Sequence, residues 1–237
     1  MRKLFPSKRS SRRGRRRFST YLLFLLLLLT ACTTKPSTSD LDESPQLFTL
    51  YSTSATSSWM PQIYNCAERA QLGLIARTSN IDAADISLRI GAVEDGYQID
   101  EIALVVIGNS QNSVATLNHK EIDDIFTGKI RSWSEVGGED APINLWIYDK
   151  ENDLQIAFNS KMLEAGIMST MARQAQNAEE MRQEIAQDTY AIGISTQAEA
   201  GTNLQILHSV GKFPVLAVTK NEPRGIVFAI INCLQED

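Results

Sequence analysis

Two patterns of apolar residues recur along the chain: short apolar runs, and apolar residues spaced by three and four. Together they predict strands that alternate with helices. Short apolar runs bounded by polar turns predict strands at 47–51, 72–76, 85–90, 99–108, 143–148 and 190–195. Apolar side chains spaced by three and four predict helices at 59–70, 118–127, 153–163, 177–187 and 226–235. A further stretch, 204–219, reads as two strands joined at Gly211-Lys212. This order of elements favours an α/β architecture with parallel strands.

Helix-capping residues account for the most patterned stretch, 121–138, without any catalytic or binding role. A capping box joins an N-cap side chain to an acid three residues later. The predicted boxes pair Asn118 with Glu121, Ser132 with Glu135, and Asn177 with Glu180. Gly128 suits the stop of the first of these helices. We therefore interpret this stretch as scaffold.

Charge divides the chain into two regions and excludes one class of partner. At 237 residues and 43% apolar composition, the chain can bury a substantial core, as one domain or two small lobes. The net charge of −5 includes nine Lys and Arg before Cys32 and no acid there, which leaves 14 bases against 28 acids beyond it. A body with a net charge of −14 repels polyanions, so we expect no nucleic-acid partner.

The N-terminus predicts export and a lipid anchor. A basic region precedes the apolar run 21–29, which is about half the ~20 residues that cross a bilayer. The sequence "LTAC" ending at Cys32 resembles the lipobox of bacterial lipoproteins, although an ordinary signal with an incidental cysteine is the alternative. We expect a signal peptide at 1–31, lipidation of Cys32 and a polar tether at 32–45. The folded part is then held outside the cytoplasm, close to a membrane.

Two cysteines remain, Cys66 and Cys233, on apolar-patterned helical segments near the two ends of the fold. Outside the cytoplasm they could pair, or both could stay as buried free thiols. Neither alternative gives a catalytic cysteine, because a basic neighbour that would lower the thiol pKa is not evident.

Motifs of catalysis and metal binding are missing from the sequence. No HExxH, P-loop or GxGxxG pattern occurs, and Gln197 stands where a nucleophile elbow around Ser195 needs glycine. Neighbouring acids on a helix diverge around its axis, so Asp123-Asp124 and Glu179-Glu180 predict solvated acidic faces. We expect no enzyme, no cofactor and no metal.

Two motifs resemble a known family. "LNHKEIDDIFTGKIRSWSEVGGEDAPINLW" is similar to the second-lobe signature of phosphate-type solute-binding proteins of ABC importers. "AEEMRQEIAQDTYAIGIS" is similar to the helix and strand by which that family's chain returns toward the first lobe, and 102–107 matches a crossing strand. The resemblance covers about 47–235.

The resemblance implies a two-lobe, type II periplasmic-binding-protein-like α/β fold with mixed sheets and a cleft between the lobes. Lobe 1 would comprise 46–105 and 192–237, and lobe 2 would be 106–191. It implies a membrane-anchored solute-binding lipoprotein that holds phosphate, another small oxyanion or a polar solute by lobe closure. The partners would be that ligand and an importer permease. A sensor or interaction lipoprotein with a degenerate cleft is the alternative.

Candidate ligand-binding residues come from three places. The loop "STSATSS" follows a strand and supplies hydroxyls without bulk, although a Ser/Thr-rich helix cap would read the same way. Phosphate-binding members carry an arginine and Ser-Gly-Thr where this chain reads "DKENDLQIAF", which puts Asp149, Glu151 and Asp153 at the oxyanion position. The predicted ligand-binding residues are Ser52, Thr53, Ser54, Thr56, Ser57, Arg89, Lys150 and Asn152. Arg89 could instead be a surface charge.

Overall fold

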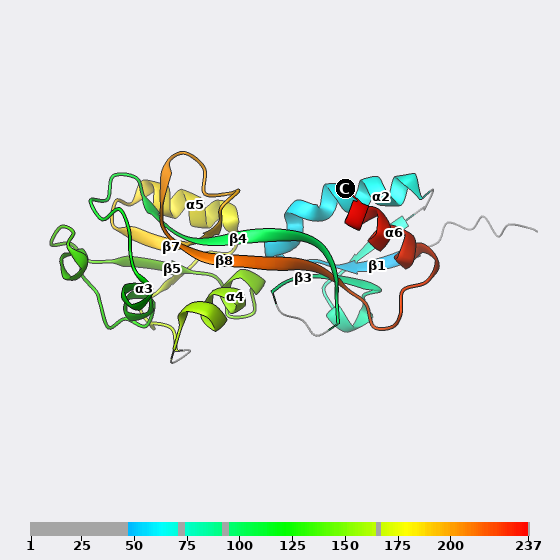
Figure 1. Ribbon diagram of the computed structural model, residues 1–237, viewed down its shortest axis with the longest axis horizontal. Helices are drawn as coiled ribbons and strands as arrows, with labels where there is room; N and C mark the ends of the chain where they lie inside the picture. The colour runs from blue at the N-terminus through cyan, green and yellow to red at the C-terminus, as the bar shows by residue number, and fades with distance from the viewer. Residues whose placement is uncertain (1–46, 71–73, 92–94, 165–166, 237) are drawn as a thin grey trace, which may run out of the picture. The chain divides into compact units, whose positions relative to one another are not determined.

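The computed structural model describes residues 47–70, 74–91, 95–164 and 167–236 (Figure 1). The predicted signal peptide, the tether and Cys32 lie outside the described residues. Residues 45–237 form a compact unit of their own, and its large apolar cluster extends from Phe48 to Leu234. This unit therefore has its own core.

Eight strands form one mixed sheet in the order β2-β1-β3-β8-β4-β7-β5-β6. The strands are β1 (Leu47–Tyr51), β2 (Leu74–Thr78), β3 (Ile86–Ile90), β4 (Tyr97–Asn109), β5 (Asn144–Ile147), β6 (Arg173–Gln174), β7 (Ala191–Thr196) and β8 (Leu204–Val218). Strand β1 is parallel to β2 and β3, and β5 is parallel to β6 and β7. The central pairs β3–β8, β8–β4 and β4–β7 are antiparallel. The predicted α/β class with mixed pairing is confirmed.

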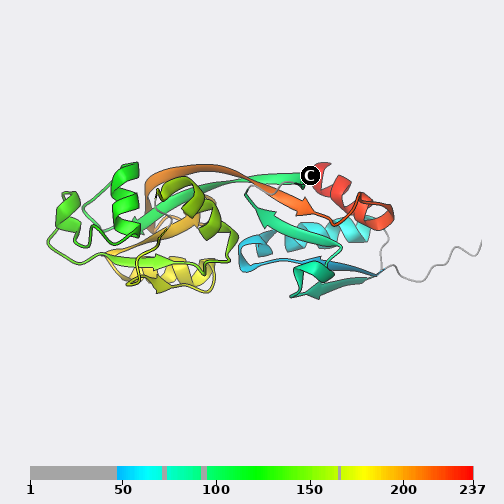
Figure 2. The ribbon, with the colours of Figure 1, turned by 90° about the horizontal axis from the view of Figure 1, so that it is seen from below.

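The two long strands β4 and β8 run side by side at the centre of the sheet (Figure 2). They lie between β2, β1 and β3 on one side and β7, β5 and β6 on the other. The prediction of two strands joined at Gly211 is wrong, because β8 is continuous through this glycine. Leu104 pairs with Gly211 and Val105 with Ser209, so one extra residue of β8 is accommodated as a bulge. Gly211 has φ +139°, which only glycine adopts easily. The glycine therefore marks a bulge where the sequence suggested a turn.

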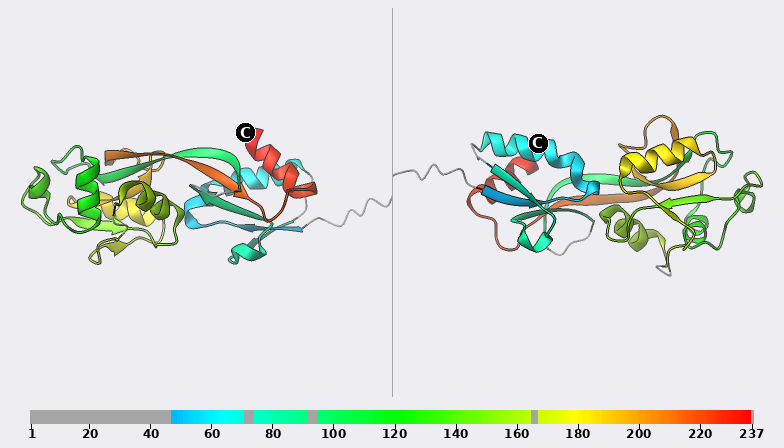
Figure 3. Two further views of the ribbon diagram at one scale, coloured as in Figure 1. Left: turned by 60° about the horizontal axis from the view of Figure 1, so that its bottom comes forward. Right: turned by 180° about the vertical axis from the view of Figure 1, so that it is seen from behind.

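Five α-helices and three short 3₁₀ helices accompany the sheet in the described part of the chain. They are η1 (Ser54–Trp59), α2 (Met60–Arg69), η2 (Ile81–Ala83), α3 (His119–Phe126), η3 (Trp133–Val136), α4 (Asp153–Met162), α5 (Ala178–Gln187) and α6 (Gly225–Glu236). Helix α5 lies over β7 on one face of the sheet, whereas α3 and α4 lie on the other face (Figures 1 and 3). A Cβ at Gly193 of β7 would lie 2.5 Å from the Met181 sulfur of α5, so glycine lets the helix approach this strand without a shift of Met181.

A disulfide joins Cys66 of α2 to Cys233 of α6, across 167 positions of sequence. Of the two alternatives that the sequence leaves open, the structure contains the paired one. The two helices also pack against each other. The disulfide therefore connects α2, near the beginning of the described chain, to α6, its last helix.

Two of the three predicted capping boxes are complete. The side chains of Asn118 and Ser132 each accept from backbone in the turn that follows, and each partner acid accepts from the cap. The third box is half-formed. Asn177 accepts from the Glu180 N–H at 2.9 Å, but the Glu180 carboxylate accepts from the N–H of Gln176 instead of that of Asn177.

The interpretation of Asp123-Asp124 as a solvated acidic face is wrong. Both residues are buried, with 3% and 8% of their surface exposed. The loop after α3 returns Lys129, whose ammonium lies 3.1 Å from a carboxylate oxygen of each. Asp123 also accepts from the N–H of Glu164 at 3.2 Å. Lys120 of the same helix also pairs with Asp124, whereas Lys129 comes from outside the helix, so helix periodicity alone did not reveal the full set of partners.

Within the described residues, no helix combines the length and apolarity that a membrane crossing requires. The predicted lobe boundaries, 105/106 and 191/192, fall inside β4 and β7. The division into lobes stays a prediction.

Candidate functional site

A pocket of about 420 Å³ lies where the loops after β1, β5 and β6 meet. We call it the cleft pocket. Its lining residues are Tyr51, Thr53, Ser54, Asp149, Glu151, Asn152, Gln174, Ala175 and Gln176. Because β5 and β6 are parallel, their carboxyl ends meet at one edge, which is where α/β sheets generally bind ligands.

The loop after β1 brings only part of its predicted set to the cleft pocket. Thr53 and Ser54 line it, and Ser52 accepts a hydrogen bond from Arg77 at 3.2 Å outside the lining. Thr56 is fully buried, and its Oγ1 accepts from the Thr53 N–H at 3.0 Å. Ser57 donates to the Ser54 carbonyl at 2.8 Å. The helix-cap alternative thus accounts for the last two hydroxyls.

The loop after β5 approaches the first loop through Asn152. Its Oδ1 accepts from the Leu154 N–H at 2.9 Å and caps α4, while its Nδ2 lies 3.5 Å from the Ser54 hydroxyl oxygen. Lys150 of the same loop is exposed and does not line the cleft pocket. The structure therefore brings together Thr53, Ser54 and Asn152 of the predicted residues.

Arg89 is committed to a partner within the protein. At the end of β3 it donates from Nε at 3.0 and 3.1 Å, and from a terminal nitrogen at 2.7 Å, to the carboxylate of Asp153. The N–H of Ile90 donates to the same carboxylate at 3.1 Å. The hydrogen bonds to Asp153 raise the pKa of Arg89 further above its ordinary value. The interpretation of Arg89 as a surface charge is wrong, because its guanidinium is paired with a buried carboxylate. A contact of Arg89 with a ligand stays a prediction.

The electrostatic character of the cleft pocket is acidic. Asp149 accepts from the Glu151 N–H at 2.9 Å and from the Gln174 side-chain amide at 3.1 Å, both neutral donors. The lining contains Asp149 and Glu151 but, among the described residues, no Lys, Arg or His. In the same described part of the chain, no group of three or more His, Cys, Asp or Glu is placed to hold a metal ion. The arrangement offers hydroxyls, amides and carboxylates to a guest.

Sequence reasoning missed four lining residues: Tyr51, Gln174, Ala175 and Gln176. The two glutamines belong to or follow β6, which has two residues and no apolar period to announce it. Tyr51 ends β1 and looked like a strand residue only. The one signal available in the sequence was the pair of amide side chains, Gln174 and Gln176, in the segment that returns to the edge of the sheet.

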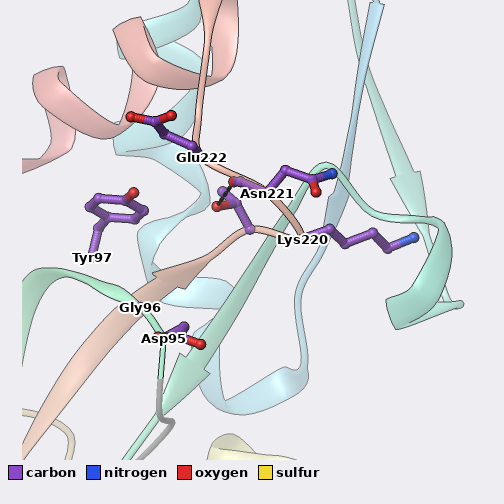
Figure 4. Close-up of a pocket in the computed structure, with 7 residues that line it drawn as sticks. Asp95, Gly96, Tyr97, Lys220, Asn221 and Glu222 are labelled. Atoms are coloured by element: carbon purple, nitrogen blue, oxygen red, sulfur yellow. Dashed lines mark hydrogen bonds between the residues drawn. The ribbon is translucent and has the colours of Figure 1, made fainter.

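A second pocket, of about 430 Å³, lies between the start of β4 and the loop that follows β8. Its charged side chains point in different directions, and Lys220 extends away from Glu222 (Figure 4). None of the predicted site residues lines it. The cleft pocket is therefore the better candidate.

Comparison with known proteins gives one family and many similar folds. Residues 66–224 match the model of a PBP superfamily domain. The fold is similar to a phosphate ABC transporter substrate-binding protein with bound phosphate from Clostridium perfringens, at a TM-score of 0.68 and 17% identity over 79% of this chain and 92% of that one. It is also similar to an ABC-type phosphate transport receptor from Vibrio cholerae, at a TM-score of 0.64 and 15% identity over 79% and 93%.

A regulator has a similar fold as well. The OxyR2 regulatory domain from Vibrio vulnificus matches with a TM-score of 0.56 and 12% identity, over 81% of this chain and 97% of that one. At such identities the likeness concerns the fold alone. The two-lobe, type II fold expected from the sequence is confirmed.

Proposed function

Because this chain belongs to the PBP superfamily, we propose that it binds a small polar solute in the cleft pocket and releases it unchanged to a membrane importer. The observation that carries the proposal is the meeting of the loops after β1 and β5 around one pocket, with Asn152 3.5 Å from Ser54. A pocket of about 420 Å³ is within the range of small-molecule sites. No bond of the solute needs to be made or broken.

The proposed mechanism is closure of two lobes on the solute. Lobe 1 (46–105 and 192–237) would contribute Thr53 and Ser54, and lobe 2 (106–191) would contribute Asn152. A ligand that contacts both lobes in the closed form and only one in the open form shifts the population toward closure. With these boundaries the chain passes between the lobes within β4 and within β7, so these strands are the connections that would flex.

Membrane attachment through Cys32 is the second part of the proposal. Two or more acyl chains hold a protein firmly at a bilayer, and burial of each CH₂ contributes about 0.8 kcal/mol. The lipobox-like "LTAC" and the polar residues that follow it support this part. We expect Cys32→Ser to release the protein from membranes in a fractionation experiment. Undiminished membrane retention of that variant would refute lipidation at this cysteine.

A thermal-shift screen of residues 45–237, the unit with its own core, tests solute binding. Ligand at a hundredfold its dissociation constant adds about 2.7 kcal/mol of stability, or about 5–10 °C for a domain of this size. The screen should include phosphate, sulfate, amino acids, amines and sugars. Ser54→Ala should reduce a shift that arises in the cleft pocket, whereas Ser57→Ala, whose hydroxyl stays within the first loop, should not. If no compound in the screen raises the unfolding temperature, solute binding loses its support.

A sensor or interaction lipoprotein is the second candidate, and one observation favours it. The Arg89–Asp153 ion pair, at 2.7 Å, joins β3 of the proposed lobe 1 to α4 of the proposed lobe 2, so charges of the chain itself hold these two parts together. The similar OxyR2 domain belongs to a regulator. A protein that co-purifies with a partner other than a permease, and that gives no thermal shift, would favour this candidate.

A further inference from the structure

We infer that the cleft pocket selects a small organic cation, a protonated amine, in preference to an oxyanion. The inference rests on the proposed function because it names the ligand class of the same site. It comes from the charges around the pocket and from the ion pair that holds Arg89.

Two carboxylates, those of Asp149 and Glu151, line the cleft pocket. Asp149 accepts only neutral donors, the Glu151 N–H and the Gln174 amide. Neither Asp149 nor Glu151 belongs to an ion pair among the described residues. Both charges are therefore open to a guest. An anion at 4 Å from either would be repelled, and an ammonium group would be attracted.

The N-terminus of α4, where an oxyanion would be favoured, already has a carboxylate of the chain in its first turn. The carboxylate of Asp153 already holds the Arg89 guanidinium and the Ile90 N–H, and it belongs to the first turn of α4. An anion near a helix N-terminus interacts favourably with the positive end of the helix dipole. Asp153, with only 1% of its surface exposed, thus occupies this position as an anion of the chain itself. A free oxyanion near this helix end would be repelled by that charge.

Two cations near the loops of the cleft pocket, Lys150 and Arg77, do not line it. Lys150 is exposed and outside the lining, and Arg77 lies at the Ser52 hydroxyl, which is also outside the lining. The rest of the pocket surface is hydroxyl, amide and one tyrosine. Ammonium groups donate to such oxygens, and aromatic rings attract cations. The described residues do not provide a metal cluster, so an organic cation fits better than a metal ion.

Calorimetric titration of residues 45–237 tests the inference with putrescine and spermidine as amines and with phosphate and sulfate as oxyanions. We expect the better amine to bind at least about tenfold more tightly than either anion. The amine affinity should also fall as ionic strength rises, because exposed charges are screened.

Two variants connect the result to the pocket. Asp149→Asn with Glu151→Gln should weaken amine binding by about tenfold per charge removed. Glu222→Gln removes the same kind of charge at the second pocket, and it should leave the affinity unchanged. An equal loss in both variants would show attraction by net charge alone and would overturn the inference.

The outcomes separate the inference from the proposed function. If phosphate or sulfate binds more tightly than both amines, the inference is wrong and solute binding stands. If an amine binds but the double variant retains its affinity, the cleft pocket is not the amine site, and the inference fails. If none of the four probes binds, the inference also fails, while the wider thermal screen still decides whether any solute binds.

Discussion

Replacement of Arg89 by methionine, which is similar in length, is the sharpest test of the structure. The change removes three of the four hydrogen bonds to the Asp153 carboxylate and leaves only the Ile90 N–H. The Asp153 side chain is 1% exposed and that of Arg89 is 27% exposed, so water can reach the arginine but hardly the carboxylate. The variant therefore leaves a buried negative charge without its positive partner.

The expected loss is about 2–4 kcal/mol of unfolding free energy. Removal of one partner of a buried ion pair costs about 3–5 kcal/mol, and we reduce this because Arg89 is partly exposed and Asp153 keeps a favourable place in the first turn of α4. With a urea slope of about 2 kcal/mol per molar, the unfolding midpoint should fall by about 1–2 M. Asp153→Asn should cost less, about 1–2 kcal/mol, because a free Arg89 can turn to solvent.

Urea unfolding of the two variants and of their combination provides the measurement. A double-mutant cycle should give a coupling free energy of about 1–3 kcal/mol. Lys212→Met is the matched control, because its pair with Glu101 has side chains 72% and 44% exposed and should contribute less than about 1 kcal/mol. If Arg89→Met costs no more than this control, or less than Asp153→Asn, the carboxylate is not a buried charge that depends on Arg89.

Three further changes test other parts of the fold. Replacement of Cys66 and Cys233 by alanine should lower the unfolding free energy by about 2–5 kcal/mol, and added reductant should then have no effect on the variant. Gly193→Ala should cost about 1–3 kcal/mol in urea, because the new Cβ would lie 2.5 Å from the sulfur of Met181, which is fully buried and has little room to move. Two backbone N–H donors lower the pKa of Glu135, so its contribution is present above the unfolded pKa of about 4.3 and is lost as the pH falls through the folded value. Glu135→Gln should therefore lose less stability between pH 7 and pH 3 than the unchanged protein, and an equal loss would refute this assignment.

Local patterns were enough to predict most of the elements. Helix α3 follows from an apolar stripe and from the Asn118–Glu121 capping box, which involves residues three positions apart. Strand β4 follows from a near-continuous apolar run, of which 104–108 is buried on both faces in the structure. Interactions of this kind lie within one or two turns or strand lengths, so a sequence window contains both partners.

Errors arose where the partner lies outside the predicted element. Gly211 resembles a turn residue until β4 supplies a partner on both sides of it. Asp123 and Asp124 resemble a solvated face until the loop after α3 returns Lys129 to both. In both cases the local residue type was read correctly and its surroundings were not.

The sequence by itself determined the α/β elements, their caps, the family resemblance and the loops around which a site could form. Only the tertiary structure decided that Thr53, Ser54 and Asn152 meet, that Gln174 and Gln176 join them, and that Arg89 is held by Asp153, 64 positions away. The physical reason is that element formation depends on neighbours along the chain, whereas the charge and shape of a pocket depend on which distant loops the sheet brings together.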